Sequence, residues 1–93
     1  MLCILMYDER VRHGRDYQPL YDLLNGWGAV HLQNSVWLAN LNTPNAAAVR
    51  GAMMAKMHPD DTACVIELKA GSNWATIHEK AGAADWLRRY ISC

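Results

Sequence analysis

The most constraining feature of this sequence is an apolar run at its start. Leu2 to Tyr7 are six apolar residues without a break, and Asp8 follows directly. A strand this apolar is expected to be covered on both faces of its sheet. The carboxylate of Asp8 then falls where the buried strand meets solvent, so we expect any chemistry of this protein at Asp8.

Length and composition predict one small domain, residues 1–93, with more apolar surface than it can bury. Hydrophobic residues make up 52% of the 93 residues, a high share for a body of this size. Because a small monomer buries a limited part of its surface, we expect some apolar surface in a subunit interface. Nine basic residues balance nine acidic ones, which argues against a broad basic footprint for nucleic acid and leaves only a local patch.

We expect neither a secretory signal nor a membrane segment in this protein. Its apolar start is short, has no basic region before it and runs into charged residues, and no run approaches the roughly 18–20 apolar residues of a membrane span. The three cysteines are Cys3, Cys64 and Cys93, an odd number without metal-ligand spacing, as expected for reduced thiols in the cytoplasm. A Cys3–Cys64 disulfide is the alternative if their strands are neighbours.

Apolar periodicity predicts three helices and three further strands. The helical stripes fall in residues 17–27, 44–57 and 83–91, and the strands in residues 29–33, 35–41 and 63–68. The first two of these strands form a hairpin with Asn34 and Ser35 in its turn. Thr43 is expected to cap the second helix, with Pro44 at the first helical position.

This order of elements predicts a ferredoxin-like α+β sandwich, βαββαβ, with an extra C-terminal helix. Right-handed crossovers are expected to place the first and third strands side by side and parallel in the middle, with both main helices on one face. The other face is apolar as well and has to be covered. We expect the terminal helix to cover part of it and a second subunit the rest, which makes a homodimer.

Several residues of the first forty match a known pattern. Tyr7-Asp8 closes the first strand, a basic loop and a helix follow, and Gly28 precedes Gln33-Asn34-Ser35-Val36-Trp37. This pattern resembles the CRISPR-associated protein two family and its relatives, including the virulence-associated protein D toxins. The resemblance implies a small ferredoxin-like homodimer linked to antiviral defence. It also implies a metal-dependent nuclease, since several family members cleave nucleic acid, mostly RNA.

The resemblance also assigns residues to a site. Asp8 of each subunit would meet its partner across the two-fold axis, and the pair would share one Mg²⁺ or Mn²⁺ ion. Arg10, Arg12 and Arg15 fall in the loop whose basic residues hold the phosphate backbone, and Ser35 matches the motif serine near the same site. Two departures indicate a divergent relative. Leu38 stands where the family has an acidic residue, and a helix replaces the last strand.

Each candidate has an ordinary structural alternative. Asp8 is either a metal ligand or a strand-terminal residue that forms a turn or pairs with Arg10. The loop arginines either bind phosphate or lie in solvent and neutralise nearby carboxylates. His13 is a candidate general acid near a scissile phosphate.

Two other groups of residues are assigned structural roles. Asp60 and Asp61 follow Pro59 and predict a turn rather than a metal pair. Among the tryptophans, Trp27 and Trp37 fall on core-facing patterns, whereas Trp74 and Trp86 are expected in an interface.

Two functional hypotheses follow. The first is a metal-dependent endoribonuclease, with Asp8 from both chains as metal ligands and a metal-bound water as nucleophile; DNA is the other substrate that this chemistry allows. The second is a non-catalytic dimeric interaction module in a phage, plasmid or defence context. It would bind a protein partner through the C-terminal region, and it rests on the neutral charge, on Leu38 and on the tryptophans of the tail.

Overall fold

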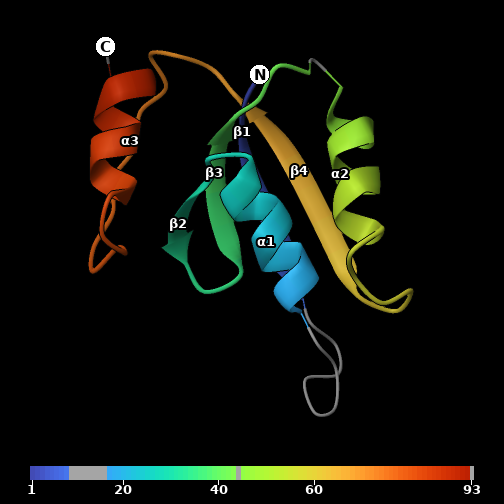
Figure 1. Cartoon of the computed structure of the whole chain (residues 1–93). Coiled ribbons are helices and arrows are strands. Elements are labelled where there is room, and N and C mark those ends of the chain that lie inside the picture. The colour runs from blue at the N-terminus through green and yellow to red at the C-terminus, as the bar shows by residue number, and fades with distance from the viewer. Residues whose placement is uncertain (9–16, 44, 93) are drawn as a thin grey trace.

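The computed structural model describes residues 1–8, 17–43 and 45–92. These residues form four strands and three helices in the predicted order, which confirms the α+β class (Figure 1). The elements are β1 (Leu2–Asp8), α1 (Gln18–Gly26), β2 (Val30–Gln33), β3 (Val36–Asn40), α2 (Ala46–Met54), β4 (Thr62–Leu68) and α3 (Ala83–Tyr90).

The four strands form one sheet in the order β2-β3-β1-β4. The first and third strands are central neighbours, as predicted, but the expectation that they are parallel is wrong. Every neighbouring pair is antiparallel, and Leu5 of β1 lies opposite Trp37 of β3. The reason is geometric. The crossover through α1 makes β2 run in the same direction as β1. The tight β2–β3 hairpin then reverses the chain, so that β3 runs opposite to both.

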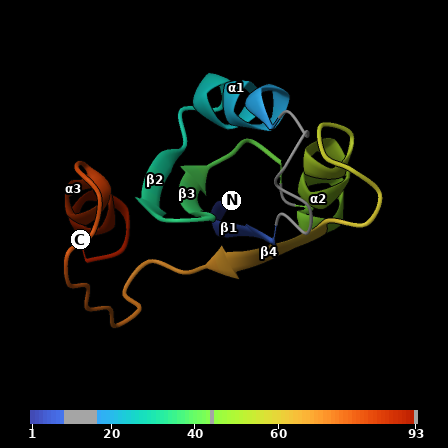
Figure 2. The same ribbon diagram turned by 90° about the horizontal axis from the view of Figure 1, so that it is seen from below.

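Both main helices pack on one face of the sheet (Figure 2). Burial alternates along β1, so that Cys3, Leu5 and Tyr7 point into this layer and are at most 7% exposed. They contact a core cluster that includes the following buried residues of both helices and of β3: Leu20, Leu24, Val49, Met53, Trp37 and Ala39. The alternating buried side chains of β1 therefore pack against the apolar stripes of α1 and α2, as the sequence predicts.

The terminal helix covers part of the opposite face. Trp86, Leu87 and Ile91 pack with Leu38 of β3 in a second buried cluster. The predicted interface role of Trp86 is therefore wrong, because its side chain is 7% exposed and lies in the core of its own chain. Trp74 packs against the same cluster and donates its indole N–H to the Ser92 hydroxyl. Partial covering of this face by the terminal helix is confirmed.

Two local predictions need correction. Asn45 caps α2, because its side-chain oxygen accepts from the backbone N–H groups of Ala47 at 2.9 Å and Ala48 at 3.3 Å. The Thr43 hydroxyl instead accepts from the Asn45 N–H at 3.3 Å. Cys3 and Cys64 do not form a disulfide. Their strands are neighbours, but Cys3 points to the helices, whereas Cys64 pairs with Met6 on the other face.

Across the described residues, none of the helices is both long and apolar enough to cross a membrane.

Candidate functional site

Asp8 lies exposed at the end of the central strand β1. Its register partner is Thr62, the first residue of β4. The β2–β3 turn reaches the same end of the sheet (Figure 1). There the backbone N–H of Tyr7 donates to the carbonyl oxygen of Ser35 at 3.1 Å. Ser35 adopts a φ of 62°, the left-handed conformation that tight hairpin turns require. The structure thus brings Asp8 and Ser35 to one end of the sheet, as predicted.

The basic candidates fall on the segment that follows Asp8. Arg10, Arg12, His13 and Arg15 lie outside the described residues, so their roles in phosphate binding and proton transfer stay predictions. The helix α1 begins at Gln18, and its start lies at the same end of the sheet as the end of β1 (Figure 1).

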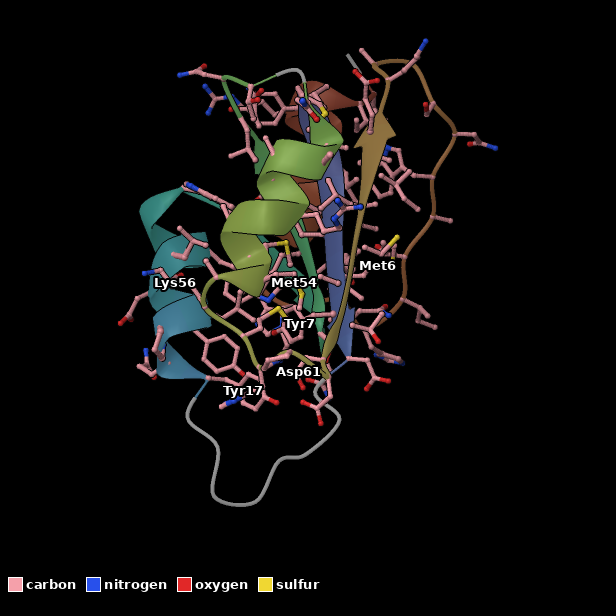
Figure 3. All side chains as sticks on the ribbon, turned by 90° about the vertical axis from the view of Figure 1, so that its right-hand side faces the viewer. Met6, Tyr7, Tyr17, Met54, Lys56 and Asp61 are labelled. Atoms are coloured by element: carbon pink, nitrogen blue, oxygen red, sulfur yellow. The ribbon has the colours of Figure 1, made fainter. Side chains whose placement is uncertain are left out.

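Beside Asp8, a buried carboxylate joins two distant parts of the chain. Asp61 is 7% exposed, and its Oδ1 accepts from the Tyr17 hydroxyl at 2.9 Å while Oδ2 accepts from the His58 N–H at 2.9 Å (Figure 3). The His58 ring packs edge-on against the Tyr17 ring, with centroids 5.6 Å apart. The predicted turn before β4 is confirmed, since the Asp61 N–H also donates to the His58 carbonyl at 2.9 Å.

Sequence reasoning missed the bond between Asp61 and Tyr17. The Pro59-Asp60-Asp61 run signals a turn in which a carboxylate bonds a nearby backbone N–H, and Asp61 does so with His58. No local pattern indicates Tyr17, which is 44 residues away in sequence. Because Asp61 directly precedes Thr62 and Tyr17 directly precedes α1, this bond ties the start of β4 to the start of α1.

Three aromatic side chains lie side by side on the face of the sheet that α1 and α2 cover: Tyr7, Trp37 and His31. The Trp37 indole N–H donates to the Tyr7 hydroxyl at 3.1 Å, and the His31 ring stacks on Trp37 with centroids 4.3 Å apart. His31 Nε2 is buried without a hydrogen-bond partner. Burial, followed by the nearby positive charge of Lys80, lowers the pKa of His31 and favours its neutral form. His31 is therefore a packing residue of this group.

The described part of the chain offers few ligands for a metal ion at Asp8. Carboxylate oxygen is the donor type that Mg²⁺ and Mn²⁺ prefer, but no group of three or more histidine, cysteine, aspartate or glutamate side chains suited to a metal occurs among the described residues. Leu38, where the resembling family has an acidic residue, is 1% exposed and packs in the cluster under α3. The donor type at Asp8 fits such a metal, but the described residues alone do not supply a set of ligands for one.

No protein-family model matches this sequence, and no curated protein is similar to it.

Proposed function

We propose that this protein is a metal-dependent phosphodiesterase that acts on RNA as a homodimer in the cytoplasm, in a defence context. The observation that carries the proposal is Asp8, an exposed carboxylate at the end of the central strand, with the Ser35 turn bonded beside it. Two further observations support a ferredoxin-like arrangement. They are the strand order β2-β3-β1-β4 and the packing of α1 and α2 on one face of the sheet.

The residue roles follow from this placement. Asp8 from two chains would hold Mg²⁺ or Mn²⁺, and such an ion supplies charge stabilisation at phosphate and a more acidic water. Arg10, Arg12 and Arg15 would hold the phosphate backbone through bidentate hydrogen bonds, and His13 would donate a proton to the leaving oxygen. Ser35 would contact the substrate from the β2–β3 turn. DNA presents the same phosphodiester and is the second substrate to test.

A second candidate is a non-catalytic dimeric module that binds a protein partner. The apolar side chains exposed away from Asp8 favour it: Ile66 is 48% exposed on β4 and Ile77 is 80% exposed in the segment before α3. The buried Leu38 also favours it, because β3 then supplies no carboxylate to the site.

The deciding experiment is cleavage of labelled RNA and labelled duplex DNA with Mg²⁺ or Mn²⁺, beside an EDTA control. We expect metal-dependent RNA cleavage that falls by at least about a hundredfold in Asp8→Asn. Glu67→Gln is the matched control, since Glu67 is an exposed carboxylate on the neighbouring strand β4. Folded Asp8→Asn protein that cleaves as fast as the native chain, or a native chain that cleaves neither substrate, would leave the binding module as the function.

A further inference from the structure

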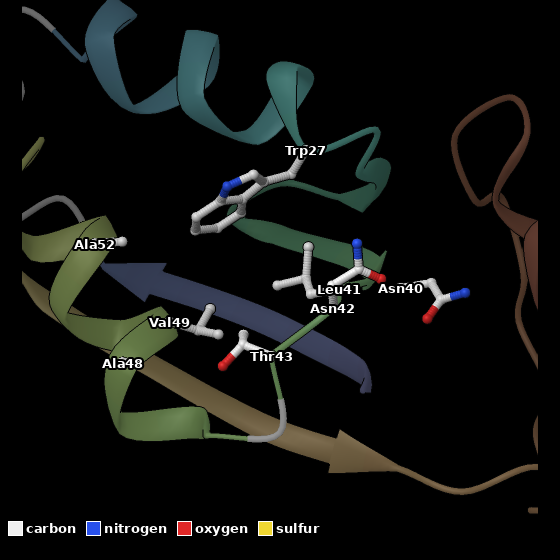
Figure 4. A pocket seen from close by; sticks show the side chains of 8 residues that line it. All are labelled: Trp27, Asn40, Leu41, Asn42, Thr43, Ala48, Val49 and Ala52. Carbon is white, nitrogen blue, oxygen red and sulfur yellow. The ribbon is translucent and has the colours of Figure 1, made fainter.

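A hollow lies at the end of the sheet opposite Asp8. It has a volume of about 570 Å³ and opens between the end of α1, the segment after β3 and the helix α2 (Figure 4). Leu2, at the start of β1, is the register partner of Asn40, which lines this hollow. The volume falls within the roughly 300–1,000 Å³ typical of small-molecule sites.

The walls of this hollow combine one aromatic face with short apolar and amide side chains. Trp27 projects from the end of α1, and Val49 and Ala52 of α2 line the opposite side (Figure 4). Asn42 and Thr43 supply hydrogen-bonding groups at the rim. Among the described residues that line it, none carries a charge. Such a lining suits a neutral, flat group that stacks on an indole and forms hydrogen bonds at its edge, as a nucleobase does.

A second hollow of about 420 Å³ adjoins the first and adds a positive charge. The two share Trp27 and Asn40, and the second is also lined by Arg89 and Tyr90 of α3. Arg89 is exposed, with its guanidinium carbon 5.3 Å from the centroid of the Tyr90 ring. Asp85 also lines this hollow, and its carboxylate pairs with Arg88 at 3.1 Å. A ligand that fills the first hollow and extends past Asn40 into the second could therefore place an anionic group at Arg89.

We propose that the two hollows form a binding site for a mononucleotide, with the base between Trp27 and α2 and the phosphate at Arg89. A hydrocarbon ligand would leave the amide and hydroxyl groups of the rim unpaired, whereas a base offers the indole a flat aromatic face and hydrogen-bonding groups at its edge. The site is independent of the proposed phosphodiesterase, because Asp8 lies at the opposite end of β1. The bound nucleotide is therefore a ligand in its own right, not the substrate of Asp8.

The test is titration of the full chain with AMP, GMP, CMP and UMP, followed by calorimetry and by ¹H–¹⁵N NMR. Adenosine and ribose 5-phosphate separate the contribution of the base from that of the phosphate. We expect AMP to bind at least about tenfold more tightly than ribose 5-phosphate and severalfold more tightly than adenosine. The NMR shifts should concentrate on the Trp27 indole N–H and the Asn42 amide.

Two pairs of variants locate the site. Ala52→Leu fills the first hollow and should weaken AMP and adenosine binding by at least about tenfold. Ala55→Leu, at the exposed C-cap of the same helix, should not change the affinity. Arg89→Gln should weaken the binding of AMP but not that of adenosine. Arg88→Gln on the same helix should weaken the binding of neither ligand.

Three outcomes would overturn the proposal. The first is that none of the four nucleotides binds the native chain. The second is that ribose 5-phosphate binds as tightly as AMP. The third is that the shifts lie away from Trp27 and Asn42, a result that needs no variant and so does not depend on whether Ala52→Leu folds.

Discussion

At the scale of single residues, the buried carboxylate of Asp61 is the group whose bonds matter most for stability. Tyr17→Phe removes a hydrogen bond to the Asp61 carboxylate, whose side chain is only 7% exposed. We expect a loss of about 1–3 kcal/mol in the free energy of unfolding, measured by urea denaturation.

The matched control is Thr76→Val. The Thr76 hydroxyl also bonds a carboxylate, that of Glu79 at 3.0 Å, but the pair is exposed. Its loss should change the free energy of unfolding by less than about 0.5 kcal/mol. Equal losses in the two variants would contradict a special role for the buried position of Asp61.

The second residue-scale prediction concerns the pH dependence of stability at His31. Its pKa in the folded chain is lowered, mainly by burial, so the unfolded chain binds the proton more tightly. The stabilising contribution is then complete above the unfolded-state pKa of about 6.5 and is lost as pH falls through the folded-state pKa. We expect His31→Phe, which keeps a ring against Trp37, to lose less stability than the native chain between about pH 7.5 and about pH 5.5.

Urea denaturation of both proteins at the two pH values measures this difference. A native chain and a His31→Phe variant with identical pH dependence would show that His31 titrates alike in the folded and unfolded states.

At the scale of elements, the glycines of two helices give opposite predictions. A Cβ at Gly51, inside α2, meets no atom within 4 Å, so Gly51→Ala should raise the free energy of unfolding by about 0.5–1 kcal/mol. Gly82 precedes α3 with a φ of 90°, and a Cβ there lies 3.7 Å from Val30 Cγ1. Gly82→Ala should therefore lower stability by about 1–2 kcal/mol. Thermal denaturation of both variants checks the signs, and a stabilised Gly82→Ala would contradict the left-handed turn.

The order of the elements was predictable because each one carries its own local pattern. The apolar run of β1 and the stripes of α1 and α2 are readable from spacing alone. What the patterns do not carry is the relation between elements. The direction of β3 depends on how often the chain reverses between β1 and β3. The choice between Thr43 and Asn45 as the cap of α2 depends on where the backbone turns into the helix, since both residue types cap well. The apolar stripe of residues 83–91 was readable, but the packing of Trp86 against Leu38 of β3 was not.

The same limit applies to the site. Asp8 and Ser35 were expected near one site, and they lie at one end of the sheet because the Ser35 carbonyl bonds Tyr7, the neighbour of Asp8. The Asp61–Tyr17 bond and the hollow beside Trp27 arise from chain segments far apart in sequence, so no spacing rule indicates them.

At the scale of the whole molecule, the sheet face beyond α3 is the feature that predicts assembly. On this face Ile4 pairs with Ile66 and Met6 pairs with Cys64 across β1 and β4, and both Ile66 and Cys64 are exposed. Removing this apolar surface from water contributes about 25 cal/mol per Å², and a second copy would supply the cover. We expect a dimer by light scattering after size-exclusion chromatography.

Ile66→Asp tests this assembly, because a carboxylate buried in an apolar interface without a partner is strongly unfavourable. The variant should be monomeric, and its Cys64 thiol should react faster with iodoacetamide than in the native chain. Ile77→Asp is the control, since Ile77 is 80% exposed and lies outside the sheet, and it should stay dimeric. The result also bears on the proposed chemistry. The proposed site takes Asp8 from two chains, so a native chain that is monomeric at all concentrations could not share a metal ion between two subunits, and the phosphodiesterase proposal would fail with the dimer.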